Sequence, residues 1–203
     1  MFNGKKFIFI FLLSLSVSAA AYNYSIRMAV AKPTLYNFGN ILAGKFGNYR
    51  NELKAYNIDI GYLVMKDVIT YPLDLYFKGG LTYYDDSTQN NSYGMDIYVK
   101  LYYNIDFWNN RIRIGFGEGA SYTTKIIEVE RIDAQRHKDV NSHYLNYIDL
   151  SMDFDIGRLL QYKALHETYI GLLVKHRSGI FGIINNVKHG GSNYIAVSIE
   201  KNF

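Results

Sequence analysis

A histidine and a serine stand two residues apart at the end of an alternating apolar segment. Ile170, Leu172 and Val174 form the apolar row of that segment, and the same register reaches His176 and Ser178. In an extended strand such residues project from one face, so the imidazole lies close enough to accept the proton of the hydroxyl. The pair therefore predicts a serine nucleophile with a histidine general base. From spacing alone, a polar pair without chemistry is the alternative.

We expect the strands that position this pair to alternate between apolar and polar residues. The segment Tyr93–Asn104 is apolar at its odd positions, and Tyr147–Gly157 carries an apolar row on one face and aspartates on the other. Such alternation is typical of strands whose two faces meet different surroundings. Six further segments follow the pattern: Tyr24–Ala31, Ala55–Met65, Leu73–Tyr84, Arg111–Thr123, Tyr169–Ser178 and Asn193–Phe203. The sequence therefore predicts eight antiparallel strands.

The connections between these strands alternate in length. Long polar stretches such as Pro33–Lys54 and Lys125–Asn146 follow odd-numbered strands, whereas Lys66-Asp67 and Asn109-Asn110 mark short turns. Bacterial outer-membrane barrels have short periplasmic turns and longer outer loops. We therefore expect an all-β fold, an eight-stranded antiparallel transmembrane β-barrel in the cell outer membrane. The last strand ends on an aromatic residue, Phe203, which resembles the assembly signal of outer-membrane proteins. The connection Arg158–Glu167 is longer than this scheme predicts.

Charged residues favour this membrane arrangement over a soluble β-sandwich or lipocalin-like barrel, which would hold the apolar rows inside. Tyrosine-rich strand ends are also better explained by aromatic girdles at two membrane interfaces. An eight-stranded barrel is just wide enough to be filled by side chains, so mixed charges inside predict a plug of ion pairs, not an open channel. The charges expected inside are Arg27, Asp59, Asp74, Lys78, Asp96, Lys100, Arg111, Arg113, Asp149, Asp153, Asp155, Lys175 and Glu200.

The N-terminus has the pattern of an exported protein. Lysines precede an apolar run, Phe7–Val17, that is too short to span a bilayer as a helix. Ala19-x-Ala21 then supplies the small-x-small motif that signal peptidase requires. We predict a signal peptide at residues 1–21 and a single barrel domain at residues 22–203, with an uncleaved anchor as the alternative.

Composition excludes several classes of function. Removal of Lys5 and Lys6 with the predicted signal peptide lowers the formal net charge from +4 to +2, a balance that does not suggest binding to nucleic acid. The absence of cysteine excludes disulfides, thiolate catalysis and cysteine-ligated zinc. No spacing of histidines and carboxylates compels a metal site. We therefore expect neither a metal nor another cofactor.

The sequence HRSGIFG at His176–Gly182, followed by Gly190–Tyr194, resembles the lipid A deacylases, also called acyloxyacyl hydrolases. The resemblance implies that His176 is the base and Ser178 the nucleophile, both on the outer surface of the barrel. In that family a glutamate on the last strand orients the histidine. Counting back from the C-terminus puts Asn193 at that place, whereas counting forward from the histidine reaches Gly190. Asparagine orients an imidazole by accepting its N–H but cannot stabilise imidazolium by charge.

The resemblance implies a serine esterase that acts on acyl esters of lipopolysaccharide in the outer leaflet. Lipid A, other outer-membrane lipids and, during biogenesis, the barrel assembly machinery are then the expected partners. Backbone N–H groups around Gly179 are candidates for stabilising the oxyanion. A non-catalytic barrel that serves membrane integrity or adhesion is the alternative, and the missing glutamate favours it.

Glu118 and the charged run Glu128–Lys138 are interpreted without a catalytic role. Glu118 stands on an outward register among glycines, which indicates a β-bulge, with a polar contact near His176 as the alternative. The charged run Glu128–Lys138 is expected to be a solvated outer loop whose cations are able to touch lipid A phosphates.

Overall fold

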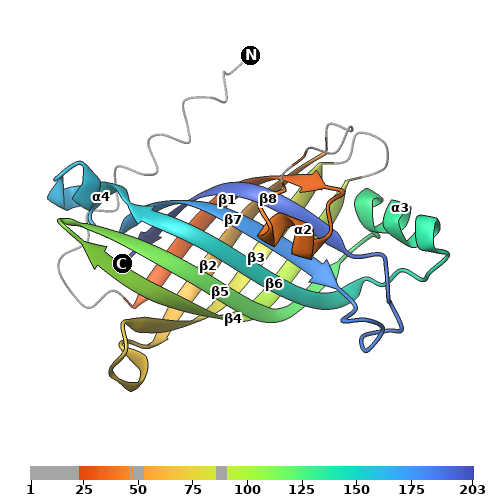
Figure 1. Cartoon of the computed structure of the whole chain (residues 1–203), viewed down its shortest axis with the longest axis horizontal. Helices are drawn as coiled ribbons and strands as arrows, with labels where there is room; N and C mark the ends of the chain where they lie inside the picture. Colours follow the sequence, from red (N-terminus) through yellow and green to blue (C-terminus); the bar gives the residue numbers. More distant parts are fainter. Residues whose placement is uncertain (1–22, 46, 48–52, 86–90) are drawn as a thin grey trace, which may run out of the picture.

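Eight antiparallel strands close into a barrel (Figure 1). The computed structural model describes residues 23–45, 47, 53–85 and 91–203, so the predicted signal peptide lies outside the described residues. Each strand pairs with the next, and the last pairs with the first, which confirms the predicted fold. The strands are β1 Tyr24–Thr34, β2 Lys54–Met65, β3 Leu73–Asp85, β4 Ser92–Phe107, β5 Asn110–Thr123, β6 Tyr144–Asp155, β7 Thr168–Ser178 and β8 Ser192–Asn202.

Short helices occupy the connections. At the end with the longer loops, α2 (Phe38–Leu42) lies against the outside of the barrel, and α3 (Glu128–His137) lies at the mouth (Figure 1). At the opposite end, η1 (Val68–Thr70) joins β2 to β3. At the same end, the long connection between β6 and β7 folds into α4 (Ile156–Leu159) and η2 (Lys163–Leu165). None of the helices in the described part of the chain has the length and apolar character that a membrane crossing requires.

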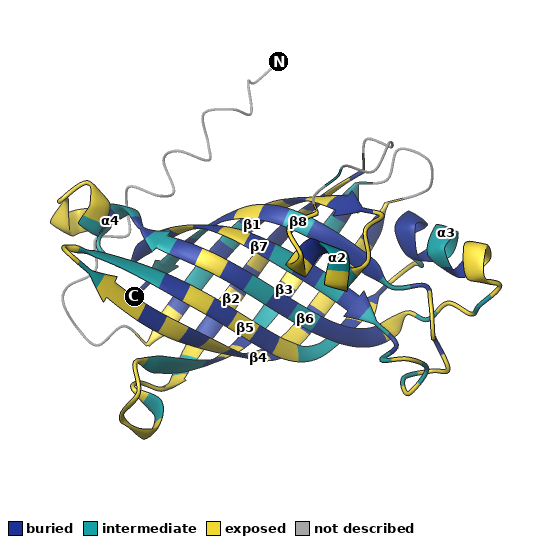
Figure 2. Cartoon of the chain, in the orientation of Figure 1, coloured by how far each residue is buried: buried dark blue, intermediate teal, exposed yellow. Residues whose placement is uncertain are grey.

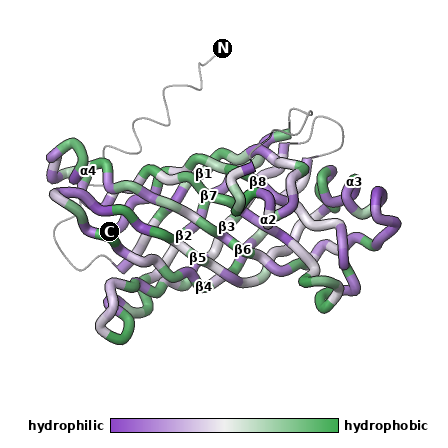
Figure 3. The backbone as a smooth tube through the Cα atoms, in the orientation of Figure 1, coloured by the Kyte–Doolittle hydropathy of each residue, from purple (hydrophilic) through white to green (hydrophobic). Residues whose placement is uncertain are grey.

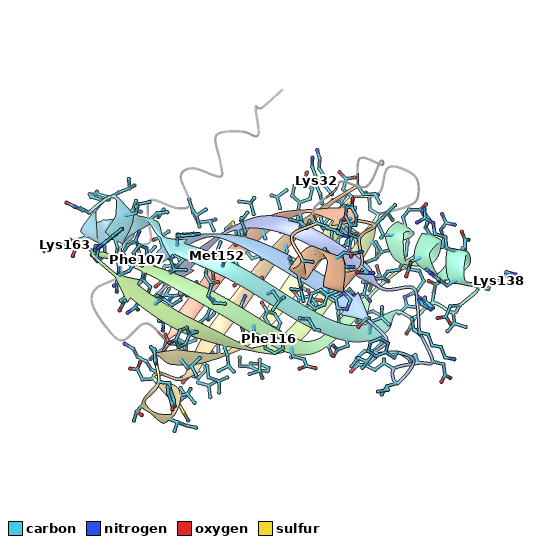
Figure 4. All side chains as sticks on the ribbon, in the orientation of Figure 1. Lys32, Phe107, Phe116, Lys138, Met152 and Lys163 are labelled. Carbon is cyan, nitrogen blue, oxygen red and sulfur yellow. The ribbon has the colours of Figure 1, made fainter. Side chains whose placement is uncertain are left out.

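The outside of the barrel wall is apolar. Exposed and buried residues alternate along every strand (Figure 2), and hydropathy alternates with them (Figure 3). Ile60, Leu81 and Val197 expose more than half of their surface. Phe116 and Met152 project from the wall (Figure 4). An apolar outside around a charged inside is the arrangement of a transmembrane β-barrel, so the soluble alternative is excluded.

Aromatic side chains surround both ends of this apolar wall. Ring pairs form between neighbouring strands at each end, with centroids 5.4 Å apart for Tyr24 and Tyr62 and 5.5 Å apart for Tyr83 and Tyr93. Aromatic girdles mark the two membrane interfaces of outer-membrane barrels. The exposed members include Tyr24, Tyr62, Tyr71, Tyr103 and Trp108 at one end and Tyr36, Tyr56, Tyr93, Tyr122 and Tyr144 at the other.

Ion pairs fill the interior. Arg27 binds Asp59 through Nε at 2.8 Å and Asp149 through Nη2 at 2.5 Å, and Lys100 binds the same Asp149 carboxylate. Nearer the periplasmic end, Glu200 accepts a hydrogen bond from Lys78 at 2.7 Å. The predicted plug of buried ion pairs is therefore confirmed.

Two of the thirteen predicted interior charges behave differently. Asp74 and Arg111 are only half-buried, because they lie at the periplasmic rim where the wall ends. Arg111 instead pairs at 2.6 Å with Asp106, whose side chain is 57% exposed. Both residues keep the predicted inward register, but they do not belong to the buried plug.

The charged run at Glu128–Lys138 is not the solvated loop that its composition suggested. It forms α3, whose buried face includes Val129, Glu130 and Ala134. Glu130 pairs with Arg177 at 3.0 Å and accepts a hydrogen bond from Ser192 at 2.8 Å. The helix is therefore connected to the outer ends of β7 and β8, next to His176 and Asn193.

Candidate active site

His176 and Asn193 face each other across the last two strands. The antiparallel register pairs them directly, and His176 Nδ1 lies 2.7 Å from Asn193 Oδ1. Both belong to outward-facing rows, which β7 and β8 otherwise fill with Leu172 and Val197. The predicted orienting contact between asparagine and histidine is thus present in the structure.

The loop after β1 fixes both side chains. Asn193 Nδ2 donates a hydrogen bond of 3.0 Å to the backbone carbonyl of Tyr36, which turns the amide oxygen toward His176. The Phe38 ring, at the start of α2, stacks on the imidazole with centroids 4.5 Å apart and an interplanar angle of 22°. Because Nδ1 donates to Asn193, the neutral ring carries its acceptor lone pair on Nε2.

Ser178 lies two residues farther along the same outward row and is half-buried. Residues two apart on a strand have Cα atoms roughly 6.6 Å apart, so the two side chains are neighbours. Among the hydrogen bonds of the described residues, none joins the Ser178 hydroxyl to His176. Proton transfer requires Oγ to come within about 2.6–3.2 Å of Nε2, a distance that catalytic groups often reach only with substrate bound.

The loop after β7, which follows Ser178 in the chain, exposes two apolar side chains. Phe181 is 92% exposed and Ile183 is 80% exposed. The loop turns back sharply at Gly179, where an added Cβ would lie 2.1 Å from the carbonyl oxygen of Val187. Exposed apolar residues at the outer end of a membrane barrel are placed to contact lipid chains.

The two acids on neighbouring strands do not join the site. Glu200, the only acid on β8, points into the barrel and pairs with Lys78, as its register predicted. Glu118 is exposed on the outer wall, opposite Ile148, which in turn is opposite His176. Strands are about 4.8 Å apart, so Glu118 stands roughly 10 Å from the histidine backbone.

The predicted bulge around Glu118 was wrong. β5 pairs without a register shift from Asn110 to Thr123 with β4 and from Ile112 to Tyr122 with β6. The neighbouring glycines serve the interior instead, because an added Cβ at Gly117 would lie 3.0 Å from the Tyr98 ring. They make room for the plug and leave the ladder regular.

Hydrogen bonds and ring stacking join the loop after α3 to the loop that carries His189. Asp139, in the loop after α3, accepts backbone hydrogen bonds from His189 at 2.5 Å and from Val140 at 2.8 Å. These N–H groups hold the pKa of Asp139 below its ordinary value. The rings of His137 and His189 stack 4.1 Å apart across the same contact. By contrast, burial raises the pKa of Glu130 despite the attraction of Arg177.

Three contributors to this region were missed by sequence reasoning. Tyr36 acts through its backbone carbonyl, which has no signature in the sequence, and Phe38 reaches the site only through the fold of its loop. Asn146 lies opposite Ser178 because β6 begins three residues before the predicted Tyr147. Its place in the even-numbered row of Ile148 and Leu150 was the available signal.

No metal site accompanies the cluster. Within the described segments, no three histidine or carboxylate side chains are grouped so as to hold a metal ion. The chemistry available is therefore that of hydroxyl, imidazole and amide groups at the edge of an apolar wall.

Comparison with known proteins supports the fold. No family model matches the chain, and no curated protein matches it. Among solved structures, the outer membrane enzyme PagL is similar at a TM-score of 0.60 and 11% identity, over 88% of this chain and 99% of that chain. Neisserial surface protein A (NspA) also matches, at a TM-score of 0.49 and 12% identity, over 92% and 100% of the two chains. At 11% identity, the likeness to PagL concerns the eight-stranded barrel alone.

Proposed function

We propose that this barrel is a serine esterase that cleaves an acyl ester of lipid A in the outer leaflet. Ser178 is the nucleophile, His176 the general base, and Asn193 orients the imidazole. The observation that carries the proposal is the 2.7 Å contact between His176 and Asn193 on the lipid-facing wall, beside a serine in the same row.

The neutral Asn193 gives this site its particular chemistry. Its oxygen holds the N–H of Nδ1, so Nε2 accepts the proton of Ser178 as Oγ attacks. A general base of this kind contributes about 10² to 10⁴ in rate. The positive imidazolium then has no carboxylate partner, but the face of the Phe38 ring, 4.5 Å away, carries negative charge density.

The position of the site indicates a substrate that arrives within the membrane. Phe181 and Ile183 follow Ser178 in the loop after β7, and these exposed apolar side chains suit the acyl chains of a lipid. The HRSGIFG stretch resembles the lipid A deacylases, and PagL, whose barrel is similar, is described as an outer membrane enzyme. Lipopolysaccharide is therefore the proposed substrate, other outer-membrane lipids are its surroundings, and the barrel assembly machinery is the proposed folding partner.

A non-catalytic barrel is the second candidate function. Asparagine occupies the place that glutamate holds in the resembling family, and no hydrogen bond among the described residues joins Ser178 to His176. A barrel that serves membrane integrity or adhesion through its outer loops would have both features.

Mass spectrometry of lipid A distinguishes the two functions. Cells that express the wild type, Ser178→Ala or His176→Ala are compared, together with His166→Ala as a matched control at the periplasmic end. Heat-dependent gel mobility checks that every variant forms the barrel. We expect the wild type and the control to remove one acyl chain and the two site variants to remove none.

An unchanged lipid A profile in cells with well-folded wild-type barrel, across several lipid A types, would refute the esterase. The second function would then be preferred. Activity that persists in Ser178→Ala would instead locate the chemistry elsewhere.

A further inference from the structure

Glu130, on the buried face of α3, joins the last two strands from inside the barrel. Its Oε1 lies 3.0 Å from Nη1 of Arg177 and accepts a hydrogen bond of 2.8 Å from the hydroxyl of Ser192. Each of the three residues exposes no more than 2% of its surface. One carboxylate oxygen therefore connects β7 to β8 within the barrel interior.

The two residues that Glu130 joins are direct neighbours of the candidate site. Arg177 follows His176 on β7, and Ser192 precedes Asn193 on β8. The register pairs Arg177 with Ser192 and His176 with Asn193. Successive residues of a strand point to opposite faces, so the carboxylate lies on the inner face directly behind the site. A change in strand separation at the inner pair is therefore passed to the 2.7 Å contact on the outer face.

The ladder between β7 and β8 ends at this point. Ser178 is the last residue of β7, Ser192 is the first of β8, and the last pair of the ladder is Arg177 with Ser192. Strand ends open locally more easily than strand centres. Arg177 also reaches the next strand, because its Nη2 donates a hydrogen bond of 3.0 Å to the carbonyl of His143, directly before β6. The contacts of Glu130 and Arg177 thus connect three strands where fraying would begin.

Stability alone does not explain this buried ion pair. Oε2 of Glu130 and Nε of Arg177 are buried without a hydrogen-bond partner among the residues that the structure describes. Incompletely bonded charges in an interior cost free energy, and well-packed apolar residues in their place are often as stable or more stable. What the pair supplies is a fixed position for the end of each strand.

We propose that Glu130 is a positioning residue that keeps His176 and Asn193 in hydrogen-bond contact by bracing β7 and β8 from inside the barrel. The inference rests on the proposed esterase function, in which the imidazole takes the proton of Ser178. Without the brace, the strand ends separate and the N–H of His176 loses its acceptor, so both neutral tautomers of the ring become populated. Only the tautomer with its proton on Nδ1 has the Nε2 lone pair that faces the serine proton.

Tautomer populations and kinetics of the purified barrel in detergent micelles test the proposal. NMR of isotope-labelled histidine at about pH 8, where an ordinary imidazole is neutral, shows which ring nitrogen carries the proton, and His176→Ala assigns the signal. We expect one tautomer, protonated on Nδ1, in the wild type and two tautomers in Glu130→Ala. A displacement of about 1 Å costs on the order of 10²-fold in rate, so kcat for p-nitrophenyl laurate should fall about tenfold or more with KM little changed.

Two further variants separate bracing from the loss of an acid on α3. Glu128→Gln removes the same charge from a carboxylate that pairs with Arg131 within the helix, and this matched control should keep one tautomer and wild-type kcat. Ser192→Ala removes the hydroxyl that Glu130 binds. Because the hydroxyl acts through that contact, the double variant Glu130→Ala with Ser192→Ala should lose no more activity than Glu130→Ala alone.

The outcomes for the brace and for the esterase are distinct. A single tautomer in folded Glu130→Ala overturns the proposal whatever its kcat, as do losses that multiply in the double variant. If Glu130→Ala does not form the heat-modifiable barrel, Ser192→Ala decides by the same tautomer measurement. No turnover by the wild type, with this ester or with lipid A, refutes the esterase, whereas the tautomer populations still decide whether Glu130 positions the ring.

Discussion

The substitution Asp149→Asn removes the central anion of the interior plug. The Asp149 carboxylate accepts hydrogen bonds from Arg27 Nη1 at 3.1 Å, from Arg27 Nη2 at 2.5 Å and from Tyr147 at 3.1 Å, and it also binds Lys100. An asparagine in its place keeps the volume but retains only one acceptor oxygen. Its amide N–H groups would then face two cations that are themselves donors.

The expected cost follows from burial. The side chains of Arg27, Lys100 and Asp149 are all 0% exposed. Arg27 would keep its pair with Asp59, whereas Lys100 would lose its ion pair and keep its hydrogen bond to Ser151. Removing one partner of a buried ion pair destabilises a protein by about 3–5 kcal/mol. Asp106→Asn is the matched control, because its side chain is 57% exposed and exposed pairs contribute about 0–1 kcal/mol.

Equilibrium urea unfolding in lipid vesicles, followed by gel mobility of the folded barrel, measures the free energy of unfolding for both variants. The double variant with Lys100→Met removes one cation together with the anion. We expect it to recover about 0.5–3 kcal/mol relative to the additive sum, the range for coupled neighbours. If Asp149→Asn costs no more than Asp106→Asn, or if the double variant is simply additive, the plug does not hold the barrel as argued.

Three further predictions concern the outer end. Phe38→Leu keeps apolar packing but removes the aromatic face from His176; since such a face contributes about 0.5–1 kcal/mol to a cation, kcat should fall about two- to fivefold with unchanged barrel stability. Because the pKa of Asp139 is depressed by the N–H groups of His189 and Val140, its stabilisation is present above the unfolded value of about 3.9 and is lost as the pH falls through the lower folded value. Hydrogen exchange in the loop that carries His189, corrected for intrinsic rates, should therefore be constant from neutral pH to about pH 5, and loosening above pH 5 would contradict this linkage. Phe181→Ser should raise KM for a micellar ester about tenfold or more and leave kcat intact, because burial of phenylalanine contributes about 1.5–3 kcal/mol and each 1.4 kcal/mol is about tenfold. A fall in kcat alone would contradict the lipid contact.

The strands were predictable because each separates two environments. Alternation of apolar and polar residues identified the eight strands. It also predicted that charged residues such as Arg27 and Glu200 point into the barrel, as the structure shows. Alternation did not predict burial at the rim of the barrel. Asp74 and Arg111 keep the inward register, but the wall ends before it can bury them. A register predicts direction, whereas burial depends on how far the neighbouring strands extend.

The candidate site was predictable only along its own strands. His176, Ser178 and Asn193 follow from register and from the resemblance of the HRSGIFG stretch. The contacts of Tyr36 and Phe38 depend on how the loop after β1 folds across β8, which local sequence does not encode. Even the glycines near Glu118 were misinterpreted, because the bulky neighbour that explains them lies on another strand.

Outward-facing positions of the barrel wall are mostly apolar, so a cluster of polar residues there is informative. Most outward positions along the barrel are apolar, although Glu118 on β5 is an exposed carboxylate. At the outer ends of β6, β7 and β8 they are Asn146, His176, Ser178 and Asn193. Folding does not require this cluster, because apolar residues would serve the interface. The hydrogen bonds from Asn193 to both His176 and Tyr36 instead hold an imidazole in one orientation. Proteins depart from their own folding rules mainly at functional sites, so this departure supports the esterase site proposed at the outer end of the wall.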